Sequence, residues 1–369
     1  MIFLFKLFKH VLSLLIILLF ISCEPLVTEF DETEDGVMYS AQTKSVAPGS
    51  VDKINVMTWN IRFGAGRLPW FGDSCGDRVI LSEKEVKTNL QGIADAINTI
   101  QPDVLIVNEI DVESKRTAYI NQVRWLLDHT YFNYATFAPN WKVQFIPSDG
   151  LGRMNMGNAI FSRWEISEST RYSLALRGDQ DALTEYFYLR RNLIKAKIKL
   201  PALDNFYILA THLAAFSTDD TKKKQVNELL EKMETLQNDG SWFILAGDMN
   251  LLPPNASKTD YCLEDMCPGE SFHNPGDDPM HKEGSYFTPE ITWLQDIYDR
   301  YQPAVTLANY LSNESKYFTH TPNPDGFWDR KIDYLFTNYQ WIPTSDQTHQ
   351  DIVDFSDHIP VSADWEVPK

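Results

Sequence analysis

The chain has 369 residues, of which 43% are hydrophobic and 13% aromatic, so it can bury a core large enough for one large α/β domain or two ordinary ones. Its formal net charge of −18, without a basic tail, argues against tight non-specific binding to nucleic acid. The acidity does not exclude an enzyme that reaches phosphates through a metal ion. The body shows neither a tandem repeat nor a low-complexity tract.

Residues 1–22 have the pattern of a signal peptide. Lys6 and Lys9 precede an apolar run that ends at Cys23, and a basic region before such a run is typical of secretion signals. The letters LFISC, ending at Cys23, resemble the lipobox of bacterial lipoproteins. We therefore predict lipidation at Cys23 and a place in the bacterial cell envelope, on a membrane and facing the periplasm or the exterior. A spanning helix and plain secretion are the alternatives, although the apolar run is short for a span.

Residues 23–50 are polar and acidic and end in the letters APGS. This composition predicts a flexible tether between the membrane and the body. Removal of residues 1–22 takes away two lysines, so the net charge of the mature chain changes from −18 to −20.

Three cysteines remain when Cys23 is set aside. Cys262 and Cys267 are close enough in sequence for a small disulfide loop in an oxidising compartment. A structural zinc site is the weaker interpretation, because it normally takes four ligands and Cys75 is the only other cysteine of the body.

Apolar runs alternate with amphipathic segments along the body. Residues 83–100 predict a helix with Val86 and Leu90 on its apolar face, and residues 218–237 predict the clearest helix, with Thr218 as its N-cap. The other expected segments are strands at 54–61, 103–109, 158–164, 190–200, 206–213, 241–250, 331–338 and 358–365, a short helix at 292–301 and an irregular surface insertion at 253–289. Strands and helices mixed in this way predict an α/β sandwich of large sheets.

Polar side chains end or interrupt several of these strands. Asp248 and Asn250 stand two residues apart at a strand end, so they point to the same face. Each residue alone has an ordinary explanation, because strand-end Asn and Asp often begin turns and a lone histidine in an apolar run is more often a core residue. Asp333 is harder to explain, since a buried carboxylate needs partners. The full set is Asn60, Glu109, His212, Asp248, Asn250, Asp333, Asp357 and His358.

This set predicts a site for phosphate chemistry. Strand ends of one fold can converge on one sheet edge, where carboxylate and amide oxygens suit Mg²⁺ or Mn²⁺. Imidazoles at the same edge can hold or protonate phosphate oxygens.

Six motifs in chain order carry a resemblance to a known family. TWNIRFG, DVLIVNEID, ATHLA, LAGDMN, RKIDYLF and SDHIPV resemble the endonuclease/exonuclease/phosphatase superfamily, which includes deoxyribonucleases, apurinic endonucleases, sphingomyelinases and inositol-polyphosphate phosphatases. The match covers about Val51 to Glu366, so residues 51–369 are expected to form one catalytic domain. The resemblance implies a four-layered α/β sandwich with two central mixed β-sheets flanked by helices.

The resemblance implies a metal side of the site. Glu109 resembles the Mg²⁺-binding glutamate, and Asn60 resembles the asparagine that helps to seat metal and phosphate. Asp357 fits a further metal ligand or a residue behind the ligands. Mg²⁺, with Mn²⁺ as an alternative, would neutralise the anionic oxygens that otherwise repel a nucleophile.

The resemblance also implies a catalytic side. Asp248 matches the aspartate that orients or deprotonates the attacking water, and Asn250 is its polar neighbour. His358 matches a histidine on the scissile phosphate, and Asp333 matches the carboxylate that orients it. His212 resembles the second phosphate-facing histidine, a candidate acid for the leaving oxygen.

The loops carry the residues that would choose a substrate. Arg153 and Asn158 precede a strand and are expected to face the phosphate, with surface solvation as the alternative for Arg153. Of the adjacent Arg190 and Arg191, one points inward, because neighbours on a strand face opposite sides. The aromatic residues Trp70, Phe71 and Trp141 stack on a base, contact a lipid or pack in the core.

These observations leave the substrate open among nucleic acid, a phospholipid headgroup and a sugar or inositol phosphate. The main hypothesis is a membrane-anchored, monomeric, Mg²⁺-dependent phosphodiesterase or phosphatase. The alternatives are a secreted nuclease for DNA or RNA and a non-catalytic surface binding protein on the same scaffold. The complete polar set argues against the last of these.

Overall fold

The computed structural model describes residues 26–72, 75–147, 149–201, 203–265, 285–323 and 326–369. The predicted signal peptide, residues 1–22, and the predicted lipidation site, Cys23, lie outside the described residues and stay predictions. Within the described ranges, no helix is both long enough and apolar enough to cross a membrane.

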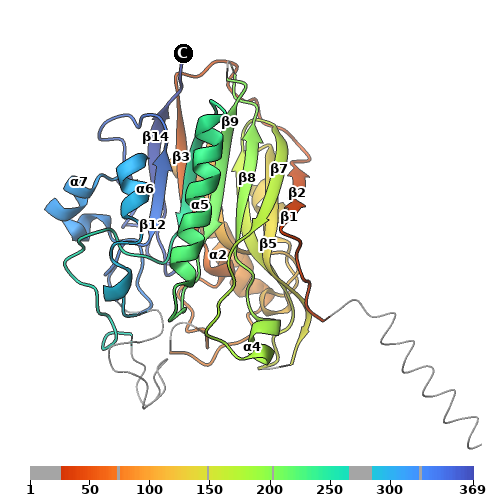
Figure 1. The fold of residues 1–369 in the computed structure, drawn as a ribbon. Coiled ribbons are helices and arrows are strands. Elements are labelled where there is room, and N and C mark those ends of the chain that lie inside the picture. The colour runs from red at the N-terminus through yellow and green to blue at the C-terminus, as the bar shows by residue number, and fades with distance from the viewer. Residues whose placement is uncertain (1–25, 73–74, 148, 202, 266–284, 324–325) are drawn as a thin grey trace, which may run out of the picture.

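Two seven-stranded mixed sheets form the centre of the molecule (Figure 1). In chain order, the first sheet contains β2 (Val37–Ser40), β3 (Lys53–Asn60), β4 (Val104–Asp111), β5 (Tyr134–Ile146), β6 (Gly152–Ser162), β13 (Gln347–Thr348) and β14 (Val361–Glu366). The second contains β1 (Thr33–Asp35), β7 (Ile166–Ser173), β8 (Asn192–Ile198), β9 (Phe206–His212), β10 (Trp242–Asp248), β11 (Gln302–Pro303) and β12 (Asp333–Thr337). Their spatial orders are β13-β14-β3-β4-β6-β5-β2 and β1-β7-β8-β9-β10-β12-β11.

Apolar side chains fill the three spaces between four layers. Val56 and Ile106 of the first sheet belong to the same buried cluster as Ile208 and Ile244 of the second. The helices α2 (Glu83–Ile100) and α3 (Gln122–His129) cover the outer face of the first sheet, and α5 (Thr221–Asn238) and α6 (Gln295–Arg300) cover that of the second. The predicted four-layered α/β sandwich, with two central mixed sheets flanked by helices, is therefore confirmed. The remaining short helices are α4 (Ala182–Phe187), α7 (Leu307–Ser312), η1 (Arg62–Gly64), η2 (Lys115–Thr117), η3 (Thr288–Glu290) and η4 (Glu314–Tyr317).

Each sheet contains one parallel pair, β3 with β4 and β9 with β10, joined by α2 and α5 respectively. Such strand–helix–strand units bring the carboxyl ends of both strands to the same sheet edge. The antiparallel neighbours β12 and β14 begin at that edge. The topology therefore gathers six chain segments at one end of the sandwich, opposite to the C-terminus in Figure 1.

The two long helices differ in how closely they follow the sequence pattern. Helix α2 has the predicted bounds, and Ser82 and Glu85 close its first turn as a capping box. Helix α5 begins at Thr221, after Asp220, and not at Thr218. Thr218 instead donates its backbone N–H and its hydroxyl to the carboxylate of Asp179.

The segment expected as a flexible tether, residues 23–50, is ordered against the body from residue 26 onward. β1 pairs with β7 at the edge of the second sheet, and β2 pairs with β5 at the edge of the first. Val27 forms an isolated antiparallel bridge with Val143 and is buried. The tether expectation is therefore corrected for this part. Its acidic, polar composition fits solvent-facing edge strands, whose pairing comes from the backbone.

The cysteines differ from the expected disulfide loop. Cys75 is disulfide-bonded, whereas Cys262 is a buried thiol. The spacing of Cys262 and Cys267 allows a disulfide, but the structure records Cys262 as a thiol, and Cys267 lies outside the described residues.

Candidate functional site

Strand ends from both sheets meet at the shared edge. Asn60 ends β3, and Glu109 lies near the end of the neighbouring β4. His212 and Asp248 are the last residues of β9 and β10 and stand opposite each other in the ladder. Asp333 begins β12 and is the antiparallel partner of Asp248. The chain thus brings together polar residues that are far apart in sequence.

The Asn60 amide links two carboxylates. Its Nδ2 donates to Glu109 Oε1 at 3.2 Å and to Asp248 Oδ2 at 3.1 Å. His212 Nε2 lies 3.3 Å from Asp248 Oδ2 and 3.9 Å from Glu109 Oε1. The other oxygen of Asp248, Oδ1, accepts the backbone N–H of Asn250 at 2.9 Å. The carboxylate of Asp248 is held at both oxygens, so its orientation is fixed.

Glu109 and Asn250 are among the site residues with left-handed backbone conformations, which residues other than glycine rarely adopt. Glu109 has φ of 53° within a bulge of β4, between Val107 and Ile110, and Asn250 has φ of 48°. A bulge bends the strand and redirects its side chain, and Glu109 lines the pocket. Backbone strain of this kind collects at functional sites.

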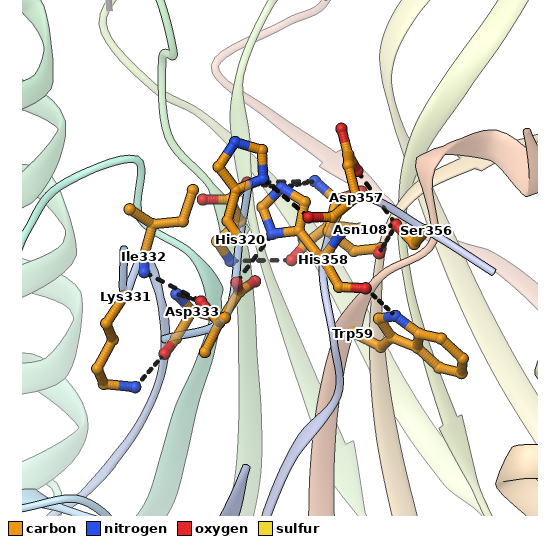
Figure 2. A network of polar contacts seen from close by, with 12 residues as sticks. Trp59, Asn108, His320, Lys331, Ile332, Asp333, Ser356, Asp357 and His358 are labelled. Atoms are coloured by element: carbon orange, nitrogen blue, oxygen red, sulfur yellow. Dashed lines mark hydrogen bonds and ion pairs between the residues drawn. The ribbon is translucent and has the colours of Figure 1, made fainter. Parts of the chain in front are cut away.

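His358 is oriented by a buried carboxylate (Figure 2). Its Nδ1 lies 2.8 Å from Asp333 Oδ2, and the Trp59 indole donates to the His358 carbonyl at 3.0 Å. The other nitrogen, Nε2, points toward Asp248 Oδ2 at 3.6 Å. Burial lowers the pKa of His358, but the charges of Asp333 and Asp248 outweigh it and raise the pKa to about 10. His358 is therefore an imidazolium at neutral pH that can donate from Nε2.

Burial favours the uncharged forms of the neighbouring Asp248 and His212. Burial raises the pKa of Asp248 to about 7, although the positive charge of His358 pulls it down. Burial lowers the pKa of His212 well below its ordinary value, and the charges of Arg191 and His358 lower it further. His212 is therefore a neutral imidazole at neutral pH, beside an aspartate whose pKa lies near neutrality and can exchange a proton with water.

The protonation of His358 can be measured directly. In EDTA, the imidazole ¹⁵N signals of His358 should keep the protonated form up to about pH 10, and Asp333→Asn should lower that midpoint because the largest attractive charge is lost. Since the folded pKa is raised above 6.5, this group contributes stability that is complete below pH 6.5 and is lost as the pH rises toward 10. The same midpoint in Asp333→Asn and wild type would contradict the orienting contact, and exposed Asp299→Asn is the control.

Asn108 is a site residue that the sequence analysis missed. It is fully buried, and its Nδ2 donates to Asn158 Oδ1 at 2.8 Å and to the Thr211 carbonyl at 2.9 Å. Its Oδ1 accepts the backbone N–H of Asp248 at 2.9 Å. Asn108 thereby connects the first sheet to the second directly behind Asp248. An amide inside the apolar run VLIVNE was the available signal.

Asn158, which was expected to face the phosphate, lies in this buried network. Its Nδ2 donates to Asn192 Oδ1 at 3.3 Å. Arg153, the other residue expected to bind substrate, is at the surface and pairs with Glu113 at 3.2 Å. The structure thus places Asn158 behind the catalytic cluster and Arg153 in solvent, and substrate binding by either residue stays a prediction.

Arg191 is the inward member of the arginine pair. Its side chain is buried in the pocket, and Nε and Nη1 have no hydrogen-bond partner among the described residues. Burial lowers the pKa of Arg191, while the charges of Tyr188, Glu109 and Asp248 oppose that shift. Unsatisfied donors in a buried cationic group are suited to an anion.

His320 and Arg62 complete the side of the site near Asp357. The His320 and His358 rings lie 4.3 Å apart, and His320 Nδ1 is 3.1 Å from the Asp357 carbonyl (Figure 2). Arg62 Nε lies 3.3 Å from Asp357 Oδ2, and Ser356 Oγ donates to Asp357 Oδ1 at 3.2 Å. Asp357, which was predicted to bind metal, is therefore ion-paired with the buried guanidinium of Arg62.

A pocket lies over the cluster, and we call it the site pocket. Its polar residues include Glu109, His212, Asp248 and His358. The aromatic residues in its wall are Phe63, Trp70, Trp141, Phe216 and Phe287. Two further arginines line it but are paired inside the protein, Arg116 with Asp111 and Arg330 with Asp265. Arg191 is thus distinguished by its unsatisfied donors.

The donor set fits a hard divalent cation. Glu109 and Asp248 share the amide of Asn60 and lie in a largely buried cluster, where two carboxylates disfavour each other's charge. Ligand atoms of Asp248, Asp333 and His358 lie within 4.8 Å of one another, as do those of His320, Asp357 and His358. Mg²⁺ and Mn²⁺ take oxygen ligands, and Glu109, which lines the pocket, can supply them. Asn60 Oδ1 accepts the backbone N–H of Arg62 at 3.0 Å and keeps a second lone pair for the ion.

The comparisons with known proteins agree with this geometry. The model of the endonuclease/exonuclease/phosphatase family matches residues 57–358. No curated protein sequence matches the chain.

Solved structures share the fold. An endonuclease/exonuclease/phosphatase from Beutenbergia cavernae has a TM-score of 0.55 at 19% identity, over 86% of this chain and 72% of its own. The catalytic domain of human Nocturnin with bound sulfate has 0.50 at 16%, over 89% and 96%. A protein of the same description from Bacteroides vulgatus has 0.50 at 13%, over 86% and 99%. Because the family model spans most of the chain, the protein belongs to the endonuclease/exonuclease/phosphatase family, whose members are metal-dependent phosphoric ester hydrolases.

Proposed function

We propose that the protein is a Mg²⁺-dependent hydrolase of phosphate esters in the bacterial cell envelope, in which water attacks the phosphorus in line with the leaving oxygen. The observation that carries this proposal is the arrangement around Asp248. Its carboxylate lies between Asn60, neutral His212 and charged His358 at the base of the site pocket. One proton acceptor and several donors therefore surround one position.

The residues divide the chemistry among them. Asp248 accepts the proton of the attacking water, which requires a heavy-atom distance of about 3 Å. His358 donates from Nε2 to a phosphate oxygen and offsets its charge, and Asp333 keeps Nδ1 engaged. His212, being neutral, can donate a hydrogen bond from Nε2 only in the tautomer that carries the proton there. Mg²⁺ held by Glu109 and Asn60 supplies charge neutralisation of the phosphate.

Arg191 is the best placed group to bind the phosphate itself. Its buried guanidinium has unsatisfied donors at Nε and Nη1 and lines the same pocket as Asp248. A charge-assisted hydrogen bond from a buried guanidinium holds a phosphate and offsets its charge. This assignment replaces solvent-exposed Arg153 as the main substrate cation.

The metal requirement gives the first test. EDTA should abolish hydrolysis, and Mg²⁺ or Mn²⁺ should restore it. Glu109→Gln should require a higher Mg²⁺ concentration for half-maximal rate, because it removes a negative ligand that faces the pocket. In wild type, Mg²⁺ should raise the melting temperature, since a ligand of the folded state stabilises it by mass action.

The control for this test is Glu113→Gln, which removes a carboxylate four residues further along the chain that pairs with exposed Arg153. The substrate panel should contain plasmid DNA, RNA, phospholipid, an inositol phosphate and synthetic mono- and diesters of p-nitrophenol. A wild type that hydrolyses none of these faster than Asp248→Ala would refute the hydrolase and favour a binding protein.

A membrane anchor at Cys23 is the second part of the proposal. The LFISC sequence supports it, and the disulfide at Cys75 supports an oxidising compartment outside the cytoplasm. Cys23→Ala should move the protein from the membrane to the soluble fraction. Retention of that variant in the membrane would count against lipidation.

A further inference from the structure

The N-terminal segment docks beside the mouth of the site pocket. Val27 bridges Val143 on β5, Thr28 donates its N–H to the Lys142 carbonyl at 2.9 Å, and Gln144 donates to the Leu26 carbonyl at 2.7 Å. Residues 26–28 therefore form a short antiparallel addition to the end of β5. In Figure 1 the described chain begins at the lower right, at the level of α4 and away from the C-terminus.

The docked segment contacts the wall of the pocket. Val27 belongs to a buried cluster with Val143 and Met154, and Trp70 and Trp141 pack against this cluster. Both tryptophans also line the site pocket. Trp141 precedes Val143 by two residues on β5, which is about 7 Å along a strand. Residues 26–28 and the pocket wall are thus parts of one packed unit.

This docking limits the distance between the site pocket and an anchor at Cys23. Val27 is the fourth residue after Cys23, and an extended chain of four residues spans at most about 14 Å. The pocket wall at Trp141 then lies less than about 30 Å from the anchored residue, the thickness of a bilayer core. A free tether of residues 23–50 would instead reach up to about 90 Å. The anchor therefore restricts the pocket to the neighbourhood of the membrane.

The surface next to the anchor has the chemistry of a membrane contact. Leu26 and Phe145 are 47% and 54% exposed, and the Leu26 carbonyl accepts the backbone N–H of Gln144, the residue before Phe145. Lys142, exposed on the same strand, accepts the backbone N–H of Thr28, so a cation lies on the strand that binds residues 26–28. Apolar side chains with a neighbouring cation suit the interface of an anionic bilayer, where such a cation contributes about 1 kcal/mol.

We propose that docking of residues 26–28 holds the mouth of the site pocket against the lipid bilayer, so that the enzyme acts on phosphate esters carried at the bilayer surface. The proposal rests on the anchored hydrolase proposed above. The acidic body is repelled by anionic lipid, so the short connection and the patch of Leu26, Phe145 and Lys142 would together set its orientation. The patch faces a lipid surface here, because the anchored residue is only three residues from Leu26.

The test uses two substrates with the same scissile bond, one embedded in the bilayer and one soluble. Comparing their rates separates the access of the pocket to the bilayer from its hydrolytic activity. The full chain, reconstituted in phosphatidylglycerol–phosphatidylcholine vesicles, would be given bilayer-embedded hexadecyl p-nitrophenyl phosphate or soluble ethyl p-nitrophenyl phosphate. Insertion of a flexible Gly/Ser segment of about 20 residues between Pro25 and Leu26 should lower the bilayer-to-soluble rate ratio several-fold. The control carries the same segment after Lys369. An unchanged ratio would overturn the proposal, whereas absence of hydrolysis of the soluble ester would refute the hydrolase instead.

A second readout does not depend on activity. An environment-sensitive fluorophore on Phe145→Cys of the vesicle-anchored protein should shift to shorter wavelength, because residue 145 enters the lipid interface. The same fluorophore on Lys369→Cys, at the opposite end of the molecule, should not shift. Equal emission at the two positions would show that this patch faces water or another partner, and would overturn the proposal even if the enzyme were inactive on every ester tested.

Discussion

Asp248→Asn is expected to lower kcat/KM for p-nitrophenyl phosphate esters by about 10²–10⁴ at saturating Mg²⁺, the range found when a positioned general base is lost. The asparagine keeps the shape of the side chain and can still accept the backbone N–H of Asn250 with its one carbonyl oxygen, whereas its NH2 group cannot accept from Asn60 and the proton acceptor is removed. The rate of ester hydrolysis at pH 8, where the wild-type carboxylate is ionised, measures the effect.

The folded state should tolerate this change. Burial raises the pKa of Asp248, so its charged form is already disfavoured in the folded protein, and the neutral amide should not lower the melting temperature in EDTA. Asp299→Asn, an exposed change of the same chemistry on α6, is the matched control and should keep full activity. A variant that is folded, binds Mg²⁺ and retains more than about a tenth of the wild-type rate would exclude Asp248 as the base.

The sequence predicted the site residues whose positions depend on a single strand. Asn60, Glu109, His212 and Asp248 stand at the ends of apolar runs, and the pattern of the runs alone places them at strand ends. Their convergence follows once β3–β4 and β9–β10 are parallel pairs. Local periodicity therefore predicted the α/β class and the strand-end positions of these four residues.

The sequence did not predict the site contacts that join the two sheets. Asn108 lies within β4 and Asn158 within β6, and only the packing of one sheet on the other shows that they bond each other behind Asp248. The choice between Arg190 and Arg191 required the register of β8, since strand parity says that one points inward but not which.

The N-terminal segment was misjudged for a different physical reason. Its composition is that of a disordered chain, with few apolar residues to bury. Its order comes from backbone hydrogen bonds to sheet edges, as between Val37 and Phe137 or Thr33 and Tyr172, and from the buried side chains of Val27 and Ala41. Edge pairing of this kind leaves almost no signal in side-chain composition.

Arg191→Met should change activity and stability in opposite directions. Loss of the guanidinium should reduce kcat/KM by about 10²-fold, because a charge-assisted hydrogen bond to the phosphate is worth about 1.5–3 kcal/mol and no second arginine with unsatisfied donors lines the described pocket. The free energy of unfolding in EDTA should rise by about 1 kcal/mol, since the folded protein no longer buries a guanidinium with two unsatisfied donors.

Arg116→Met is the matched control, because Arg116 lines the same pocket but holds Asp111 through two hydrogen bonds of 2.9 and 3.0 Å. That change leaves a buried carboxylate without its partner and should lower the free energy of unfolding by about 3–5 kcal/mol. Denaturant unfolding and ester hydrolysis kinetics on the two variants distinguish an arginine that binds substrate from one that stabilises the fold. If Arg191→Met destabilises the protein as much as Arg116→Met does, Arg191 is a structural residue and the phosphate contact must come from elsewhere in the pocket.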